Sequence, residues 1–391
     1  MIRPLHAGDL HPNSNATFAG KVAIDPETGM NQSLTDIRRS LEEMRLFATD
    51  EETRCDVVLL TGDVFDTCNP TMDEVEVIVS WVEAMAEAMP VVIIPGNHDM
   101  GSSGTSATAM APLKYRKNVH VMERPSRIVL NIGGQRVKFF GLPYPRKGLI
   151  LAHDNHQGKT SEEVTALINQ GLAAIIRSFT LEFEDDIPNI LLAHGSVDNA
   201  KVGDQPRSLS HDILIPLQEC TGFDYVGLGH IHQPQQVAPN AWYSGSLMRQ
   251  TFGEEHEPKG FNVVEICKCR PVNVQHVVNP WARKYKTLTM QDVRELEWQH
   301  VSAEHIYRIK DRLTAEEYDA AKPMIKKWVD EHPWTQIDVE VATTDRTRDA
   351  GMAECASMED SLARALKGTV EESEIPEIFG KHQQLVAEVS R

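Results

Sequence analysis

The chain has 391 residues, and its 57 Asp and Glu residues outnumber 39 Lys and Arg residues, which gives a formal net charge of −18 at pH 7. This acidity excludes a protein that coats nucleic acid through general basicity. The hydrophobic fraction of 41% is enough for a buried core. At about 100–200 residues per domain, the length predicts two or three domains.

The apolar runs are short. Residues 57–60 and 91–94 are typical, far below the roughly 20 residues that span a bilayer. The first residues lead directly into polar sequence, without the apolar core of about 7–15 residues that a signal peptide carries. The six cysteines are scattered, which favours reduced thiols over disulfides. We therefore expect a soluble cytoplasmic protein with no membrane association.

Short apolar strands that end in polar loops recur through the first two-thirds of the chain. They are predicted at Ile2–Ala7, Val57–Thr61, Val91–Pro95, Ile190–Ala193 and Tyr225–Leu228. Helical patterns with a period near 3.6 residues separate them, at Ser33–Phe47 and Glu162–Phe179. The stretches Trp242–Ser246 and Phe261–Ile266 predict closing strands. This alternation predicts a layered α/β fold, in which ligands bind beyond the carboxyl ends of the strands.

The composition changes after about Pro280. Alternating patterns at Ile306–Lys310 and around Val339 predict strands, and Thr314–Glu331 predicts a helix between them. From Asp345 the chain is polar. It carries two short helical patterns there, at Met358–Lys367 and Ile378–Val389. We expect a main domain at residues 1–280, a small α+β domain at residues 281–345, and a helical tail at residues 346–391 that is either a partner-binding segment or a loosely packed terminus.

The polar loops supply carboxylates, imidazoles and one amide. These are Asp9, His11, Asp63, Asn97, His194, His230 and His232. The mixture is typical of a dinuclear metal site, because imidazole suits manganese, iron or zinc, whereas magnesium prefers oxygen. Two cations about 3.5–4 Å apart need a bridging carboxylate, and Asp63 in the central loop is the candidate. A single loop histidine is more often a surface or core residue, so the prediction depends on the joint order of the loops.

The same loops resemble the five motifs of the calcineurin-like metallophosphoesterases. The matching stretches are Gly8-Asp9-Leu10-His11, Gly62-Asp63-Val64-Phe65-Asp66, Gly96-Asn97-His98-Asp99, His194-Gly195 and Gly229-His230-Ile231-His232. Within that superfamily, Tyr243–Glu254 and Lys259-Gly260-Phe261 resemble the SbcD branch, the bacterial and phage relatives of the meiotic recombination nuclease. The resemblance implies an α/β/α metallophosphoesterase fold with two packed sheets flanked by helices, and a small α+β capping domain.

The resemblance also implies roles for individual residues. One ion would be held by Asp9, His11, Asp63 and His232, and the other by Asp63, Asn97, His194 and His230. The two divalent ions would be manganese, the usual metal of the family. His98 would act on the scissile phosphate, by stabilising charge or protonating the leaving oxygen, and Asp66 would orient His98.

The implied function is a DNA nuclease with 3′-to-5′ exonuclease and single-strand endonuclease activity, acting in DNA end processing, repair or recombination. Its implied partners are an SbcC-like ATPase of the SMC family, docked on the C-terminal segment, and a second copy of the chain. Two alternatives stay open. One is a phosphodiesterase or phosphatase that acts on small nucleotides or phosphoproteins, and the other is a catalytically silent subunit that bridges DNA and an ATPase.

The acidity of the chain has to be reconciled with a DNA substrate. Two divalent ions would offset part of the local negative charge. Seven basic residues could supply further contacts: Arg116, Lys117, Arg124, Arg127, Arg146, Lys147 and Arg249. We expect weak DNA affinity for the isolated chain, with the partner supplying much of the binding.

One feature departs from the family pattern, and another resembles an unrelated motif. The first motif continues with Pro12-Asn13 where the family often has Leu-Gly, so no DNA contact of this loop is taken over from the family. The stretch Gly158-Lys159-Thr160 resembles the end of a phosphate-binding loop. That loop needs a glycine where this chain has His153, so nucleotide binding there is not expected.

Overall fold

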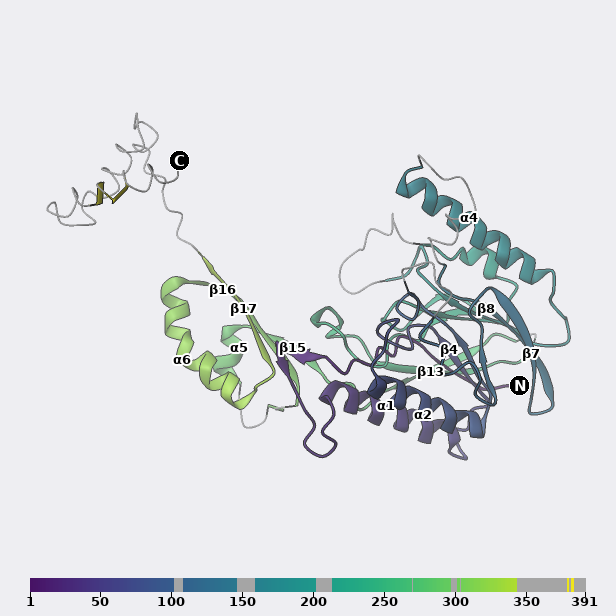
Figure 1. The fold of residues 1–391 in the computed structure, drawn as a ribbon, viewed down its shortest axis with the longest axis horizontal. Helices are drawn as coiled ribbons and strands as arrows, with labels where there is room; N and C mark the ends of the chain where they lie inside the picture. Colours follow the sequence, from purple (N-terminus) through teal and green to yellow (C-terminus); the bar gives the residue numbers. More distant parts are fainter. Residues whose placement is uncertain are drawn as a thin grey trace. The chain divides into compact units, whose positions relative to one another are not determined.

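The computed structural model describes residues 1–101, 108–145, 159–201, 213–268, 270–296, 301–302, 304–342, 378–379 and 381–382 (Figure 1). The helical pattern predicted at Met358–Lys367 lies outside these ranges, as does most of the one at Ile378–Val389. Within the described ranges, no helix is both long enough and apolar enough to cross a membrane.

The first of two six-stranded sheets contains the earliest strands of the chain. Its order is β14-β13-β1-β4-β5-β6. The bounds are β1 Pro4–Ala7, β4 Val57–Thr61, β5 Val91–Ile94, β6 Val119–Val121, β13 Gly260–Glu265 and β14 Asn273–Val278. Strands β1, β4, β5 and β6 are parallel, whereas β13 returns antiparallel to β1. The carboxyl ends of the parallel strands therefore meet at one edge.

The second sheet has the order β11-β12-β10-β9-β8-β7. Its strands are β7 Ser126–Ile132, β8 Gln135–Leu142, β9 Asn189–His194, β10 Tyr225–Gly229, β11 Gln235–Ala238 and β12 Ala241–Tyr243. The central strands β8, β9, β10 and β12 are parallel, and the hairpins β7/β8 and β11/β12 form its two margins. The predicted strands that carry polar loops are thus central in both sheets.

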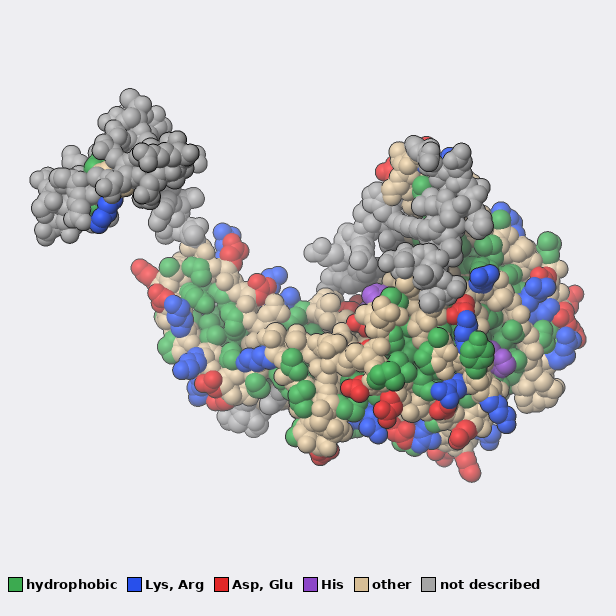
Figure 2. All heavy atoms as spheres, in the orientation of Figure 1, with side chains coloured by type: hydrophobic (Ala, Val, Ile, Leu, Met, Phe, Trp, Pro, Cys, Tyr) green, Lys and Arg blue, Asp and Glu red, His purple; other side chains and the backbone are tan. Residues whose placement is uncertain are grey.

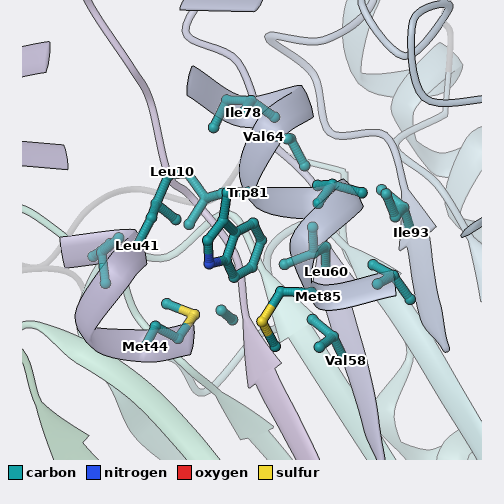
Figure 3. Packing of buried hydrophobic residues seen from close by; sticks show 14 of the residues in the cluster. Leu10, Leu41, Met44, Val58, Leu60, Val64, Ile78, Trp81, Met85 and Ile93 are labelled. Carbon is teal, nitrogen blue, oxygen red and sulfur yellow. The ribbon is translucent and has the colours of Figure 1, made fainter. Parts of the chain in front are cut away.

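The two sheets pack on each other, and helices cover their outer faces. Successive residues of β4 point into two different cores. Val57 and Leu59 belong to the core between the sheets. Val58 and Leu60 face the helices α1 (Gln32–Thr49) and α2 (Met72–Ala88). Figure 3 shows Trp81 of α2 at the centre of this outer core. The helix α4 (Ser161–Thr180) packs in the same way on the second sheet. The predicted layered α/β fold is confirmed.

Side-chain caps fix the starts of the covering helices. Thr71 and Glu74 form a capping box at α2, and Thr160 and Glu163 form another at α4. The Thr160 side chain accepts a hydrogen bond from the Glu163 amide at 3.2 Å. Thr160, which belongs to the stretch that resembles the end of a phosphate-binding loop, is therefore a helix cap.

The remaining described elements lie outside the two large sheets and their covering helices. They are β2 Thr17–Phe18, β3 Lys21–Val22, the 3-10 helices η2 Leu217–Cys220 and η3 Phe252–Glu254, β15 Tyr285–Leu288, α5 Met290–Glu295, β16 Ile306–Thr314, α6 Ala315–Glu331 and β17 Thr335–Ala342. Strands β15, β16 and β17 form a three-stranded sheet, so the strands and helix predicted after Pro280 are present. The chain divides into two compact units, residues 1–309 with 328–337, and residues 310–327 with those from 338 onward. The domain boundaries near residues 280 and 345 stay a prediction.

Candidate metal centre

The predicted site residues gather where strands of both sheets end. The loops after β1, β4 and β5 bring Asp9, His11, Asp63 and Asn97, and the ends of β9 and β10 bring His194, His230 and His232. Three groups have potential ligand atoms within 4.8 Å of one another: Asp9 with His11 and His232, Asp63 with His194 and His230, and His11 with Asp66 and His98. The first two contain the predicted metal ligands and are called the first and second group below. Asp63 also lies beside the first group, because its Oδ2 atom is 3.7 Å from His11 Nε2.

In the first group, one ring nitrogen of each histidine is already hydrogen-bonded to a carboxylate. His11 Nδ1 lies 3.1 Å from Asp66 Oδ1, and His232 Nδ1 lies 2.9 Å from Glu254 Oε1. A carboxylate only accepts, so both Nδ1 atoms carry the proton and each Nε2 is left to bind a ligand. His11 Nε2 is buried and has no hydrogen-bond partner. A cation would satisfy this buried nitrogen, so the donor set fits a borderline divalent metal.

In the second group, His194 is oriented by the main chain. Its Nδ1 atom donates to the carbonyl oxygen of Thr61 at 2.7 Å, so Nε2 has a lone pair when the ring is neutral. Nε2 lies 3.0 Å from Asn97 Oδ1 and 3.4 Å from Asp63 Oδ2, and Asn97 Oδ1 is also 3.1 Å from His230 Nδ1. Several electron-rich atoms thus converge, and a proton or a cation has to lie among them.

The electrostatics of the centre favour charged groups. Burial opposes protonation of His194, but attraction to Asp63 and Asp9 raises its pKa to about 9. Burial likewise opposes protonation of His11, and the hydrogen bond to Asp66 and the nearby carboxylates outweigh it, so its pKa is raised. For Asp63, burial is outweighed by the neighbouring histidines, and its pKa is lowered. A divalent cation would replace protons that these histidines otherwise carry.

The main chain at the site adopts conformations that L-residues seldom take. Asp9, His11, Asp63 and His230 have φ values of 52°, 43°, 48° and 103°. Each such residue costs on the order of 1–3 kcal/mol, and this kind of strain gathers at functional sites. Glycine is required beside them, because a Cβ atom on Gly96 would overlap Asp63. The Gly-Asp and Gly-Asn pairs of the motifs therefore have a steric reason.

His98 lies at the exposed side of the centre. Its amide donates to Asp63 Oδ1 at 2.9 Å, and its Nδ1 atom donates to the main-chain oxygen of Asp66 at 2.8 Å. The carboxylate of Asp66 instead accepts hydrogen bonds from His11 and, at 2.9 Å, from Asn13. Asp66 thus contacts His98 through its main-chain carbonyl group and not through its carboxylate. Asn13, one of the departures from the family pattern, holds Asp66.

Sequence reasoning gave no role to Asp99, which is fully buried beneath the centre. Its carboxylate accepts hydrogen bonds from the amides of Gly96 and Phe65, both at 2.8 Å, and of Val64 at 3.2 Å. Burial and the nearby Asp63 raise the pKa of Asp99 to about 6. Asp99 ties the loop after β4 to the loop after β5. Its place in the third motif was the only available signal.

Three of the seven basic residues considered for DNA contact are engaged elsewhere. The Arg249 guanidinium donates to the carbonyl oxygens of Ala282, Arg283 and Glu257 at 2.8–3.2 Å, which is a structural role. Arg116 pairs with Glu83, and Arg127 with Glu182. Arg146 and Lys147 lie outside the described residues. On the face shown in Figure 2, the described basic side chains are interspersed with acidic ones and form no continuous band.

The fold and the centre define a metallophosphoesterase, and the chain belongs to the calcineurin-like phosphoesterase family, whose model matches residues 2–234. Among curated relatives, it is similar to the SbcD subunit of the SbcCD nuclease of Staphylococcus epidermidis, with 24% identity over 243 residues. That match covers 59% of this chain and 62% of the relative, so it spans less than two thirds of the relative's length. A crystal structure aligned over 70% of this chain and 98% of its own has a TM-score of 0.38 and 10% identity. The predicted family resemblance is confirmed.

Proposed function

We propose that the chain is a two-metal DNA phosphodiesterase and the nuclease subunit of an SbcCD-like complex that acts in DNA repair or recombination. The observation that carries the proposal is the placement of Asp63 between two groups of metal-ligating side chains, with His98 beside them. One ion is assigned to Asp9, His11, Asp63 and His232, and the other to Asp63, Asn97, His194 and His230. Manganese is the proposed metal because the site is rich in imidazole.

The residues of the chain have separate tasks in this mechanism. Bound divalent ions would supply Lewis acidity and activate water at neutral pH. The ligand set would hold these ions, and Asp99 and Gly96 keep the loops at their close spacing. His98 is fixed by its Nδ1 hydrogen bond to Asp66, so Nε2 is the nitrogen that can carry a second proton. We assign the protonation of the leaving oxygen, or the stabilisation of its charge, to that atom.

The proposed partners follow from the relative. Its name identifies it as one subunit of the SbcCD nuclease, which supports an SbcC-like ATPase as the partner of this chain. We place the docking surface on residues 346–391 and infer that two copies of the chain pair. The proposed activities are 3′-to-5′ exonuclease and single-strand endonuclease.

The test is cleavage of end-labelled single-stranded and double-stranded DNA with manganese, magnesium or EDTA. Wild type runs beside His98→Ala, and the bound metal of both is measured. We expect manganese-dependent cleavage that falls about 10²–10⁴-fold in the variant, with its metal content unchanged. Turnover of cyclic nucleotides by a metal-loaded chain that leaves DNA intact would overturn the proposal in favour of the small-substrate phosphodiesterase. Equal loss of metal in His98→Ala would overturn the role of His98.

A further inference from the structure

Glu254 is a carboxylate beside the candidate metal centre that belongs to neither ligand group. It ends η3 and contacts His232 through Oε1, which is 2.9 Å from Nδ1 of that ring. Its other oxygen, Oε2, accepts hydrogen bonds from the Gln250 amide and from Lys259 Nζ, both at 2.9 Å. Both oxygens are therefore committed, and the carboxylate has one fixed orientation.

Lys259 contacts this carboxylate through Oε2, the oxygen that does not contact His232. Its side chain is 0% exposed, and Nζ lies 2.7 Å from Glu257 Oε2, 2.9 Å from Ser246 Oγ and 3.1 Å from the carbonyl oxygen of His232. A lysine buried this completely is costly unless its charge is paired and its donors are used. Two of these contacts reach the surroundings of His232: its own carbonyl oxygen and Ser246, whose amide donates to that same oxygen.

His232 is held less by its surroundings than His11 and His194 are, and like His230 it is only partly buried. Its side chain is 25% exposed, compared with 3% for His11 and 0% for His194. Close packing restricts the two buried rings. A ring open to solvent can rotate, and in its neutral form it can carry the proton on either nitrogen. The carboxylate is what selects Nδ1–H and leaves Nε2 for the metal.

We propose that Glu254 is a positioning residue for His232: it holds the ring as the Nδ1–H tautomer so that Nε2 completes the metal group formed with Asp9 and His11. Lys259 is the buried counter-charge that fixes Glu254. This inference rests on the proposed two-metal site, and it gives the Tyr243–Glu254 and Lys259 stretches a task in building that site. Residues that orient a metal ligand in this way are typically worth about 10–100-fold in metal affinity.

The experiment measures manganese binding by isothermal titration calorimetry on the full chain. Wild type is compared with Glu254→Ala, Glu254→Gln and the matched control Glu265→Ala. Glu265 is a carboxylate on β13 that accepts a hydrogen bond from Asn273. We expect Glu254→Ala to weaken one of two manganese ions by about 10–100-fold and leave the other unchanged. Glu254→Gln keeps an oxygen for His232 Nδ1–H and should lose less, and Glu265→Ala should match wild type.

A second readout does not depend on metal or on catalysis. Long-range ¹H–¹⁵N correlation spectra of the metal-free protein report which nitrogen of His232 carries the proton. We expect Nδ1–H in wild type and Glu254→Gln, and a shift toward Nε2–H in Glu254→Ala. Retention of the Nδ1–H form and of both manganese affinities in Glu254→Ala would overturn the proposal, as would equal weakening of both ions. If DNA cleavage proves absent, the tautomer and the binding data still decide the role of Glu254.

Discussion

His6 lies between the two sheets, directly behind the metal centre. It is fully buried, with Nδ1 2.8 Å from the Tyr225 hydroxyl and Nε2 3.1 Å from Thr61 Oγ1. The carbonyl oxygen of the same Thr61 accepts the hydrogen bond that orients His194. Burial lowers the pKa of His6 to about 3. This contact therefore depends on a neutral imidazole.

The low pKa of His6 predicts a loss of stability in acid. Between pH 6.5 and about 3 the unfolded chain binds a proton that the folded chain excludes. The contribution of His6 is therefore complete above pH 6.5 and falls as the pH decreases, by up to about 1.4 kcal/mol per pH unit. We expect His6→Gln to reduce the dependence of the unfolding free energy on pH, measured with urea in EDTA between pH 4 and 7. Parallel profiles for the two proteins would contradict this.

At the level of elements, the strands could be predicted because each is a short apolar run and each ends in a polar loop. The stretch Ile190–Ala193 was expected as a strand, and β9 covers Asn189–His194. Helix α2 was not among the predicted helices; Val75, Val77 and Val79 alternate in its sequence as they would in a strand. The capping box at its start and the burial of Trp81 determine the helix instead.

The candidate ligands could be predicted from the sequence. The residues that hold these ligands in place through hydrogen bonds could not. Imidazoles and carboxylates at strand ends are visible in the sequence as chemical types. The contacts of Asp99, Glu254 and Arg249 depend on which loops meet in three dimensions, and several join residues far apart in the chain. Asp66 illustrates this, because only the structure shows that its carbonyl group holds one histidine and its carboxylate another.

The loop after β5 predicts a sharp difference between two glycines. A Cβ atom on Gly96 would overlap Asp63, whereas a Cβ atom on Gly171 in α4 would have nothing within 4 Å. We expect Gly96→Ala to lose manganese binding and thermal stability. Gly171→Ala should bind normally and gain up to about 1 kcal/mol, because alanine favours helix. Calorimetric titration and thermal unfolding check both, and normal binding by Gly96→Ala would refute the steric argument.

For the whole molecule, an ion in the centre would connect the two sheets. Asp63 follows β4 of the first sheet, and His194 ends β9 of the second. A ligand that binds only the folded state stabilises it by about 2.7 kcal/mol at 100 times its dissociation constant. We expect manganese to raise the melting temperature, EDTA to lower it, and Asp63→Ala to remove the difference. A melting temperature unaffected by EDTA would argue against metal binding.

The charge of the molecule predicts how its DNA affinity depends on salt. The net charge is −18, and two of the basic side chains considered for DNA contact, Arg116 and Arg127, pair with carboxylates, so we expect few cations to neutralise phosphates. The logarithm of the binding constant should then fall with the logarithm of salt concentration with a slope shallower than about −3. Fluorescence anisotropy with His98→Ala and labelled DNA measures this slope. Tight binding with a steep slope would contradict it.

The order of the ligand-bearing strands has a consequence for biosynthesis. Asp9, His11, Asp63 and Asn97 leave the ribosome first, and His194 follows only after another stretch of chain that takes roughly 5–20 s to synthesise. His232 and Glu254 come later still, as does β13, which pairs with β1 in the first sheet. The nascent protein therefore carries half a centre for much of its synthesis. A chain terminated before residue 194 contains Asp63 without His194 and His230, so completion of the second sheet is the step at which a competent centre first exists.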